Sequence, residues 1–120
     1  MAEKPSGSRA GLLWFLQAVS GMLLVILLGT HMVANHFVVE GGLRTYADVV
    51  AYLTNPIILV WEVVFLIIVT FHAMLGVRSV LLDLGPGPGL RRALNLALTV
   101  LGILMVTYGI WLTLQIRGQG

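Results

Sequence analysis

The sequence predicts an all-α integral membrane protein with three transmembrane helices. Of its 120 residues, 58% are apolar and only 10% are charged, whereas about a quarter of the residues in an average soluble domain are charged. A soluble fold of this size has too much surface to leave so few charges outside. The composition therefore excludes a soluble domain, a disordered chain and, with a net charge of only +2, a protein with a nucleic-acid partner.

Long stretches without charge predict the three helices. Residues 10–39 and 93–116 contain no Asp, Glu, Lys or Arg, and residues 57–77 contain only Glu62. About 20 apolar residues are needed to cross the hydrocarbon core as a helix, and each stretch is long enough. We expect one membrane-anchor domain over residues 1–120. Its transmembrane helices are predicted at about 10–36, 56–84 and 90–116.

The two connections between these helices differ in character. Residues 37–55 contain Gly41-Gly42 and end in Asn55-Pro56, which indicates a loop with a short interfacial helix, and Pro56 suits the first turn of the second transmembrane helix. Residues 85–89 alternate glycine and proline. Glycine weakens a helix and proline removes a backbone donor, so the second helix must end there.

Basic residues predict the orientation, because cytoplasmic loops carry an excess of Lys and Arg. Two of the basic residues fall on the side of the first connection and the C-terminus, namely Arg44 and Arg117. The others fall on the opposite side: Lys4, Arg9, Arg78, Arg91 and Arg92. This bias places the N-terminus in the cytoplasm and the C-terminus outside.

His72 is the first candidate site residue, because ionisable groups within lipid are costly and usually face a protein interior or a cofactor. At about 100° per residue, His72 shares a helix face with Gly76 and Asp83, and Gly76 leaves room for a flat macrocycle. A neutral imidazole is the usual axial ligand of a b-type haem, and Arg78 could pair with a propionate. Alternatively, His72 hydrogen-bonds a neighbouring helix, and spacing alone leaves both interpretations open.

His31 lies toward the outer end of the first helix, on a face that also carries Gln17 and Ser20. This face is expected to meet partner helices; the alternative is an interfacial histidine satisfied by water. His36 lies about 140° further around a regular helix, so it cannot join His31 on one metal, and we interpret it as interfacial. His31 and His72 lie at different depths. If both bind haem, there are two haems, and each needs a second ligand from another subunit.

Glu62 precedes His72 by ten residues on the second helix. Burial would make it a candidate proton carrier or quinol partner; the alternative is an interfacial carboxylate paired with Arg44 or water. On the third helix, Asn95, Gly102 and Gly109 recur at heptad spacing. Small residues at such positions favour close helix packing.

Residues 72–78 (HAMLGVR), followed by Asp83, resemble the H-x-x-x-G-x-R-x-x-x-x-D motif of succinate dehydrogenase and fumarate reductase membrane anchors. Residues 17–21 (QAVSG) are similar to the R-x-S-G element of these anchors. Residues 29–37 with Gly41-Gly42 resemble the first-helix segment of di-haem anchors. The position of Glu62 also fits these anchors. The likeness covers about residues 10–116 and points to the D-type small anchor, a cytochrome b556-type hydrophobic subunit.

The resemblance implies a subunit of complex II (succinate:quinone oxidoreductase). In this family a flavoprotein subunit oxidises succinate, an iron–sulfur subunit carries electrons to the membrane, and two anchors bind haem b and quinone. Such an anchor is half of a helical bundle that a second anchor completes, in the inner (cytoplasmic) membrane of a prokaryote. The main alternative is a haem-free structural anchor.

The same resemblance assigns roles to individual residues. His72 and His31 match haem-iron ligand positions, and Arg78 belongs to the haem motif. Gln17, Ser20 and Asp83 match the vicinity of the quinone site. This chain departs from the pattern at Ala18, where the family has arginine, and at Leu84, where a tyrosine often follows the aspartate. The second anchor or the iron–sulfur subunit is then expected to supply the main polar contacts to the quinone.

Overall fold

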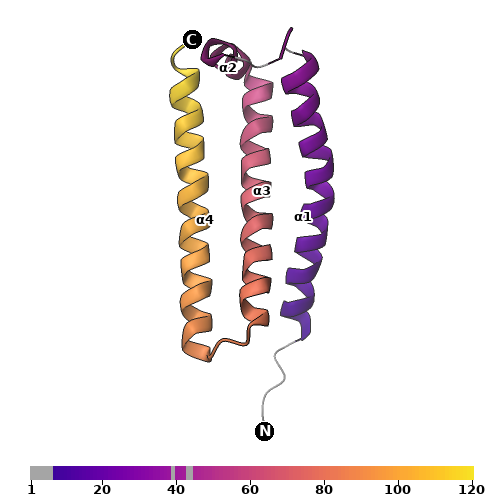
Figure 1. Ribbon diagram of the computed structural model, residues 1–120, viewed down its shortest axis with the longest axis vertical. Helices are drawn as coiled ribbons and strands as arrows, with labels where there is room; N and C mark the ends of the chain where they lie inside the picture. Colours follow the sequence, from indigo (N-terminus) through magenta and orange to yellow (C-terminus); the bar gives the residue numbers. More distant parts are fainter. Residues whose placement is uncertain (1–6, 39, 43–44) are drawn as a thin grey trace.

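The computed structural model describes residues 7–38, 40–42 and 45–120 and is helical nearly throughout. Three long α-helices run along its 63 Å length (Figure 1). The elements in chain order are α1 (Gly7–Val33), a π-helical stretch η1 (Ala34–Val38), α2 (Tyr46–Thr54), α3 (Pro56–Asp83) and α4 (Pro88–Arg117).

Local sequence explains where the helices begin and end. The Asn55 side chain accepts hydrogen bonds from the first free N–H groups of α3, and Pro56 occupies the first turn, where its missing donor costs nothing. Gly85 has a φ of 69° after the end of α3, a conformation that glycine adopts without steric cost. The predicted loop 85–89 is too long, because Pro88 already begins α4.

The N-terminal helix also differs from the expectation. It begins at Gly7 rather than near residue 10, and a regular α-helix ends at Val33. Residues 34–38 then continue as a π-helix, so the angle expected between His31 and His36 on a regular helix does not apply. The first connection contains the expected short helix, α2, which a capping box of Thr45 and Asp48 starts.

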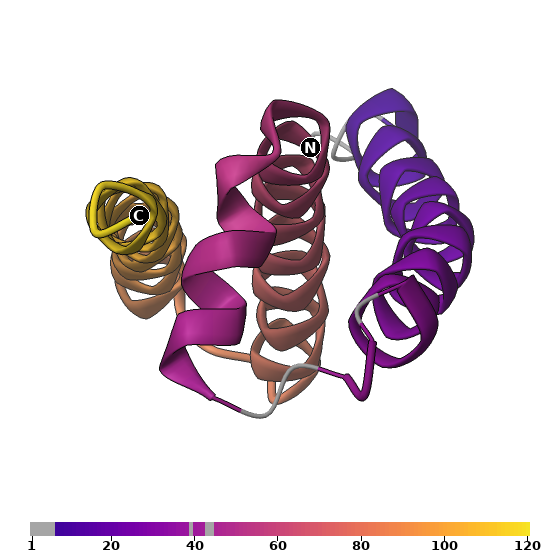
Figure 2. The same ribbon diagram turned by 90° about the horizontal axis from the view of Figure 1, so that it is seen from above.

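The long helices form a layer with α3 in the middle (Figures 1 and 2). In the described part of the chain, α1 and α4 each pack against α3 and not against each other, and α2 packs across α3 and α4. We call the end that contains Gly7 and the α3–α4 linker the N-terminal end, and the end covered by α2 the C-terminal end. The helix α2 thus covers the ends of α3 and α4.

All three long helices are sufficiently long and apolar to cross a membrane, namely Gly7–Phe37, Pro56–Asp83 and Pro88–Arg117. This confirms the predicted fold class. Large apolar side chains are exposed along every one of them. Among the described residues only a few apolar side chains are buried, and the polar residues Ser20 and Thr70 are buried as well. Exposed apolar side chains and buried polar ones are expected for a chain surrounded by lipid, where helices associate through small and polar residues.

The interface of α3 and α4 is close, as the heptad spacing predicted. A Cβ atom on Gly102 would lie 3.2 Å from Cγ of Met74, and one on Gly109 would lie 2.6 Å from Cδ2 of Leu66. Asn95, the third member of the heptad series, instead accepts a hydrogen bond of 2.8 Å from Nε of Arg78. Glycine therefore lets the two helix backbones approach, and a polar bond joins them toward the N-terminal end.

Candidate functional site

Two polar clusters lie between α1 and α3. The first, which we call the His72 cluster, consists of His72, Ser20 and Gln17 and lies in the N-terminal half of the layer. Nδ1 of His72 is 3.0 Å from Oγ of Ser20, and Ser20 is buried. A Cβ atom on Gly21 would lie 3.2 Å from Cε1 of the His72 ring. The α1 backbone therefore lies directly against the imidazole and restricts its movement.

The hydrogen bonds of Ser20 determine which nitrogen of His72 carries the proton. Oγ of Ser20 donates to the backbone carbonyl of Gln17 at 3.0 Å. A hydroxyl has one proton, so both contacts of Ser20 can be hydrogen bonds only if Nδ1–H of His72 donates to Oγ. No hydrogen bond to Nε2 of His72 is present among the described residues. The arrangement thus leaves Nε2 with an unused lone pair, as a metal-ligating imidazole requires.

Gln17 occupies the space beside Gly76. A Cβ atom on Gly76 would lie 3.3 Å from Nε2 of Gln17, so the room that we expected there for a macrocycle is filled by an amide side chain. The other amide atom, Oε1, is buried and has no hydrogen-bond partner within the described part of the chain. An unpaired buried carbonyl oxygen is unusual and is ready to accept from a donor.

Replacing Ser20 by alanine should destabilise the protein by about 1 kcal/mol, because Nδ1–H of the half-buried His72 would lose its acceptor. We expect a lower thermal midpoint for the purified protein in detergent. Ser79→Ala is the matched control, since Ser79 is exposed on α3. Equal midpoints for the two variants would contradict the hydrogen-bond assignment at His72.

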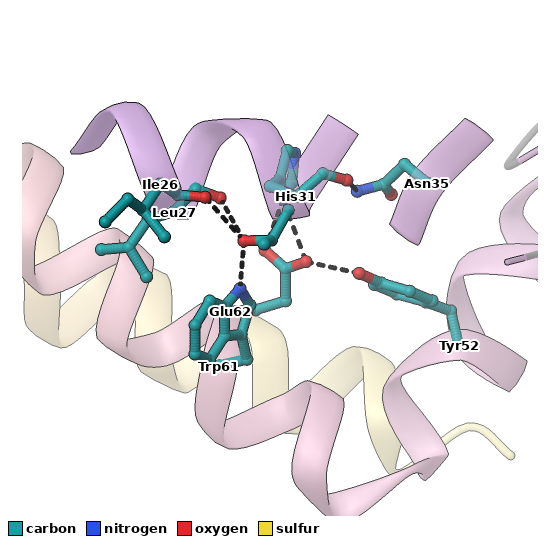
Figure 3. A network of polar contacts seen from close by, with 8 residues as sticks. Ile26, Leu27, His31, Asn35, Tyr52, Trp61 and Glu62 are labelled. Atoms are coloured by element: carbon teal, nitrogen blue, oxygen red, sulfur yellow. Dashed lines mark hydrogen bonds and ion pairs between the residues drawn. The ribbon is translucent and has the colours of Figure 1, made fainter. Parts of the chain in front are cut away.

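The second cluster, the His31 cluster, consists of His31, Glu62 and Tyr52 and lies at the C-terminal end (Figure 3). Nδ1 of His31 is 2.8 Å from Oε2 and 3.0 Å from Oε1 of Glu62. The hydroxyl of Tyr52 donates to Oε1 of Glu62 at 2.6 Å. The Glu62 side chain is only 14% exposed. One carboxyl group from α3 is therefore held between a histidine of α1 and a tyrosine of α2.

Several neighbours fix the geometry of this cluster. The ring of Phe65 packs on the His31 ring, with 4.9 Å between the centroids. Nδ2 of Asn35 donates to the His31 carbonyl at 2.6 Å. Nε1 of Trp61 donates to Oγ1 of Thr30 at 3.2 Å. The Phe65 and Trp61 contacts join α3 to α1, whereas the Asn35 bond lies within the first helix and its π-helical extension. Figure 3 shows Trp61 and Asn35 with the His31–Glu62 contact.

Tyr52 is the site residue that the sequence did not reveal. Glu62 was expected to be a proton carrier or quinol partner, or else an interfacial carboxylate paired with Arg44 or water; Arg44 itself lies outside the described residues. The usable signal was the capping box of Thr45 and Asp48, which predicts a helix over the following residues. A helix there carries Tyr52 over the end of α3, within reach of Glu62.

Burial and the adjacent Glu62 carboxylate raise the pKa of Tyr52 above its ordinary value of 10.0, and the hydrogen bond from Asn35 acts in the opposite direction. A raised pKa means that the folded state favours the neutral phenol. Its stabilising contribution is therefore complete below about pH 10 and is lost as the pH rises further. We expect the wild type to lose stability more steeply above pH 10 than Tyr52→Phe, measured by thermal unfolding. Parallel pH profiles would contradict the burial of this hydroxyl beside a carboxylate.

The remaining predicted residues do not join either cluster. Arg78 lies about 120° around α3 from His72, and it lines a groove of about 580 Å³ between α3 and α4 together with Asn95. Asp83 is the last residue of α3 and is exposed. His36 is exposed in η1, with Phe37 as its aromatic neighbour. Their predicted roles depend on groups outside this chain and stay predictions.

Among the residues that the structure describes, the side chains alone do not form a multidentate metal site. Over residues 7–38, 40–42 and 45–120, no group of three or more His, Asp or Glu residues is placed to hold a metal ion. A haem needs no such group, since the porphyrin supplies four nitrogens and the protein only axial ligands. The donor sets at His72 and His31 each offer one imidazole nitrogen, which fits an axial ligand.

The comparison with known proteins identifies the family. Residues 7–113 match the family model described as "Succinate dehydrogenase/Fumarate reductase transmembrane subunit". The chain belongs to this family. The anchor is similar to the "Succinate dehydrogenase hydrophobic membrane anchor subunit" of Archaeoglobus fulgidus, with 31% identity over 88% of this chain and 89% of the relative. The protein of the same name from Thermoplasma acidophilum is 28% identical over 97% of this chain and 94% of the relative.

No solved structure matches the anchor. The family match nevertheless includes both clusters and all the candidate site residues. At 1.5 Å per residue, Ser20 and His31 are about 16 Å apart along α1. The His72 and His31 clusters of the anchor are therefore separate sites, and two histidines so far apart cannot ligate one iron.

Proposed function

We propose that this anchor ligates haem b in a succinate:quinone oxidoreductase and helps to pass electrons from the iron–sulfur subunit to quinone. The supporting observation is the hydrogen bond from Nδ1–H of His72 to Ser20, because it leaves Nε2 free to act as an axial ligand. Ligating histidines usually donate their other ring N–H to an acceptor in this way. A second anchor subunit supplies the other ligand and completes the helical bundle.

His31 is proposed as the ligand of a second haem near the C-terminal end. Its Nδ1 is engaged by Glu62, and no described residue hydrogen-bonds its Nε2. The two proposed haems would lie one above the other rather than share an iron, because the clusters are about 16 Å apart along α1. Arg78 is proposed to bind a propionate of the haem on His72. Its Nε–H donates to Asn95, so its other guanidinium N–H groups would make this contact.

When bound, haem b supplies one-electron transfer between the iron–sulfur subunit and quinone. The chain's own residues orient the imidazoles and hold their Nδ1 protons. Gly21 lets the α1 backbone lie close to His72, and the apolar helix faces exclude water. Cofactor chemistry in such a subunit depends on these features, which set the orientation, the hydrogen bonding and the local dielectric.

Gln17, Ser20 and Asp83 are proposed to lie near the quinone site. The supporting observation is the buried, unpaired Oε1 of Gln17, which is able to accept a hydrogen bond from a quinol hydroxyl. Glu62 is also proposed as a proton or quinol site. Its two carboxyl oxygens already accept hydrogen bonds from His31 and Tyr52, so this role would come in addition to these bonds.

The proposed location is the inner (cytoplasmic) membrane of a prokaryote, with the N-terminal end in the cytoplasm. The two relatives come from archaea, which supports a prokaryotic source for this chain. The N-terminal end carries Arg9, Arg91 and Arg92, which supports the orientation. In this arrangement the His72 cluster lies on the side of the iron–sulfur and flavoprotein subunits.

Purification of the complex from membranes through a tag on this chain tests the proposal. We expect the iron–sulfur and flavoprotein subunits to copurify, succinate-dependent quinone reduction to be present, and a reduced-minus-oxidised spectrum of b-type haem. A complex with succinate activity but without haem would leave the haem-free structural anchor. Absence of both activity and the partner subunits would overturn the assignment to complex II.

A further inference from the structure

Glu62 and Tyr52 form a chain of hydrogen bonds that ends at His31, and this chain differs in kind from the one at His72. The acceptor of the His31 Nδ1–H is a carboxyl oxygen at 2.8 Å. The acceptor of the His72 Nδ1–H is a hydroxyl oxygen at 3.0 Å. Hydrogen bonds to charged acceptors are shorter and about twice as strong as those between neutral groups. The two imidazoles are therefore unequal donors.

Tyr52 binds the Glu62 carboxyl group from a helix that does not span the membrane. It lies in α2 and is only 7% exposed, and its hydroxyl donates to Oε1 of Glu62 at 2.6 Å. Oε2 is the carboxyl oxygen closer to His31. Oε1 thus accepts from Tyr52 while it also lies 3.0 Å from Nδ1 of His31, so the tyrosine shares the carboxyl group with the imidazole.

We infer that Glu62 and Tyr52 are positioning residues that set the ligand strength of His31, an inference that rests on the proposed haem ligation. The carboxylate fixes the Nδ1–H tautomer and makes Nε2 a stronger electron donor, because partners of this kind raise ligand basicity. A stronger donor stabilises ferric iron and lowers the midpoint potential of the haem on His31. Tyr52 moderates this effect by taking part of the carboxylate's hydrogen-bonding capacity.

The inference predicts shifts of opposite sign in two variants of the purified complex. Glu62→Gln replaces the charged acceptor by a neutral one, and the midpoint potential of the His31 haem should rise. The expected change is about tenfold in the ratio of reduced to oxidised haem at a fixed potential, which is 59 mV for a one-electron couple. Tyr52→Phe removes only the hydroxyl, and the same haem should shift to a lower potential by a smaller amount.

Potentiometric titration followed by absorbance measures these shifts, and electron paramagnetic resonance of the oxidised haem reports the ligand field independently. Tyr46→Phe is the matched control, because Tyr46 lies in the same helix and is 60% exposed. The haem that disappears in His31→Ala is the one to follow. The His72 haem should keep its potential in Glu62→Gln, Tyr52→Phe and Tyr46→Phe. If Glu62→Gln does not assemble, Tyr52→Phe decides alone.

Unchanged potentials and resonance spectra, with the His31 haem present, would overturn the positioning role while leaving the haem ligation intact. Shifts of the same sign in the two variants would overturn the moderating role of Tyr52. A wild-type complex that has no haem sensitive to His31→Ala would contradict the proposed ligation instead. The failure of the inference and the failure of the proposed function are thus distinguishable.

Discussion

Replacing His72 by alanine is expected to remove one of the two b-type haem signals of the purified complex. Ser20 holds the His72 imidazole through Nδ1, which leaves Nε2 for iron, and alanine offers no lone pair. Haem held by one remaining axial ligand, from the second anchor, should be lost or become high-spin. The reduced-minus-oxidised spectrum and the haem content measure this loss.

His36→Ala is the control for this experiment, since His36 is an exposed histidine of the same chain outside both clusters. We expect it to retain both haem signals. A His72→Ala complex with the wild-type haem content and an unchanged low-spin spectrum would contradict the proposed ligand.

Replacing Gly109 by leucine is expected to prevent correct packing of α4 against α3. A Cβ atom at this position would already lie 2.6 Å from Cδ2 of Leu66 and 3.3 Å from its Cδ1, so a full leucine side chain must displace Leu66 and overfills the interface. Overpacking of this kind costs about 1–3 kcal/mol or more. We expect a marked fall in the amount of anchor recovered in the complex and in its thermal midpoint.

Gly89→Leu provides the comparison, because Gly89 lies in the first turn of α4 and a Cβ there would meet nothing within 4 Å. This variant should be recovered at the wild-type level. Equal recovery of the Gly109 and Gly89 variants would show that close approach at Gly109 is not needed for assembly.

The transmembrane helices are predictable from the sequence because lipid imposes a simple rule on composition. Long uncharged stretches predicted all three, and Pro56 and the glycine–proline linker predicted where α3 begins and ends. Helix ends are less predictable, since proline fits equally well in a loop or in the first turn of a helix. Pro88 is an example: it was assigned to the linker and instead begins α4.

The partners of the polar residues could not be predicted in the same way. The sequence singled out His72, His31, His36 and Glu62 because ionisable groups are rare in such helices, and Ser20 through its helix face and the family resemblance. It did not show that Ser20 pairs with His72 or that Glu62 pairs with His31, because these bonds depend on how α1 and α3 are aligned along their axes. The contact of Tyr52 depends in addition on the path of the connecting segment.

The π-helical stretch and the Arg78–Asn95 bond illustrate the same limit. Nothing in the hydropathy of residues 34–38 distinguishes a π-helix from a regular helix, so the direction of His36 was predicted from the wrong geometry. Arg78 and Asn95 were interpreted separately, one with a propionate and one with helix packing. The structure joins them across α3 and α4.

Haem ligation by this anchor is tested most directly by an experimental density map of the purified complex at a resolution that shows both histidine rings. We expect iron porphyrin at Nε2 of His72, with Nδ1 bonded to Ser20, and a second porphyrin at Nε2 of His31, with Nδ1 bonded to Glu62. Density showing each Nε2 in contact only with side chains, lipid or water would exclude haem ligation and leave a membrane anchor without an electron carrier.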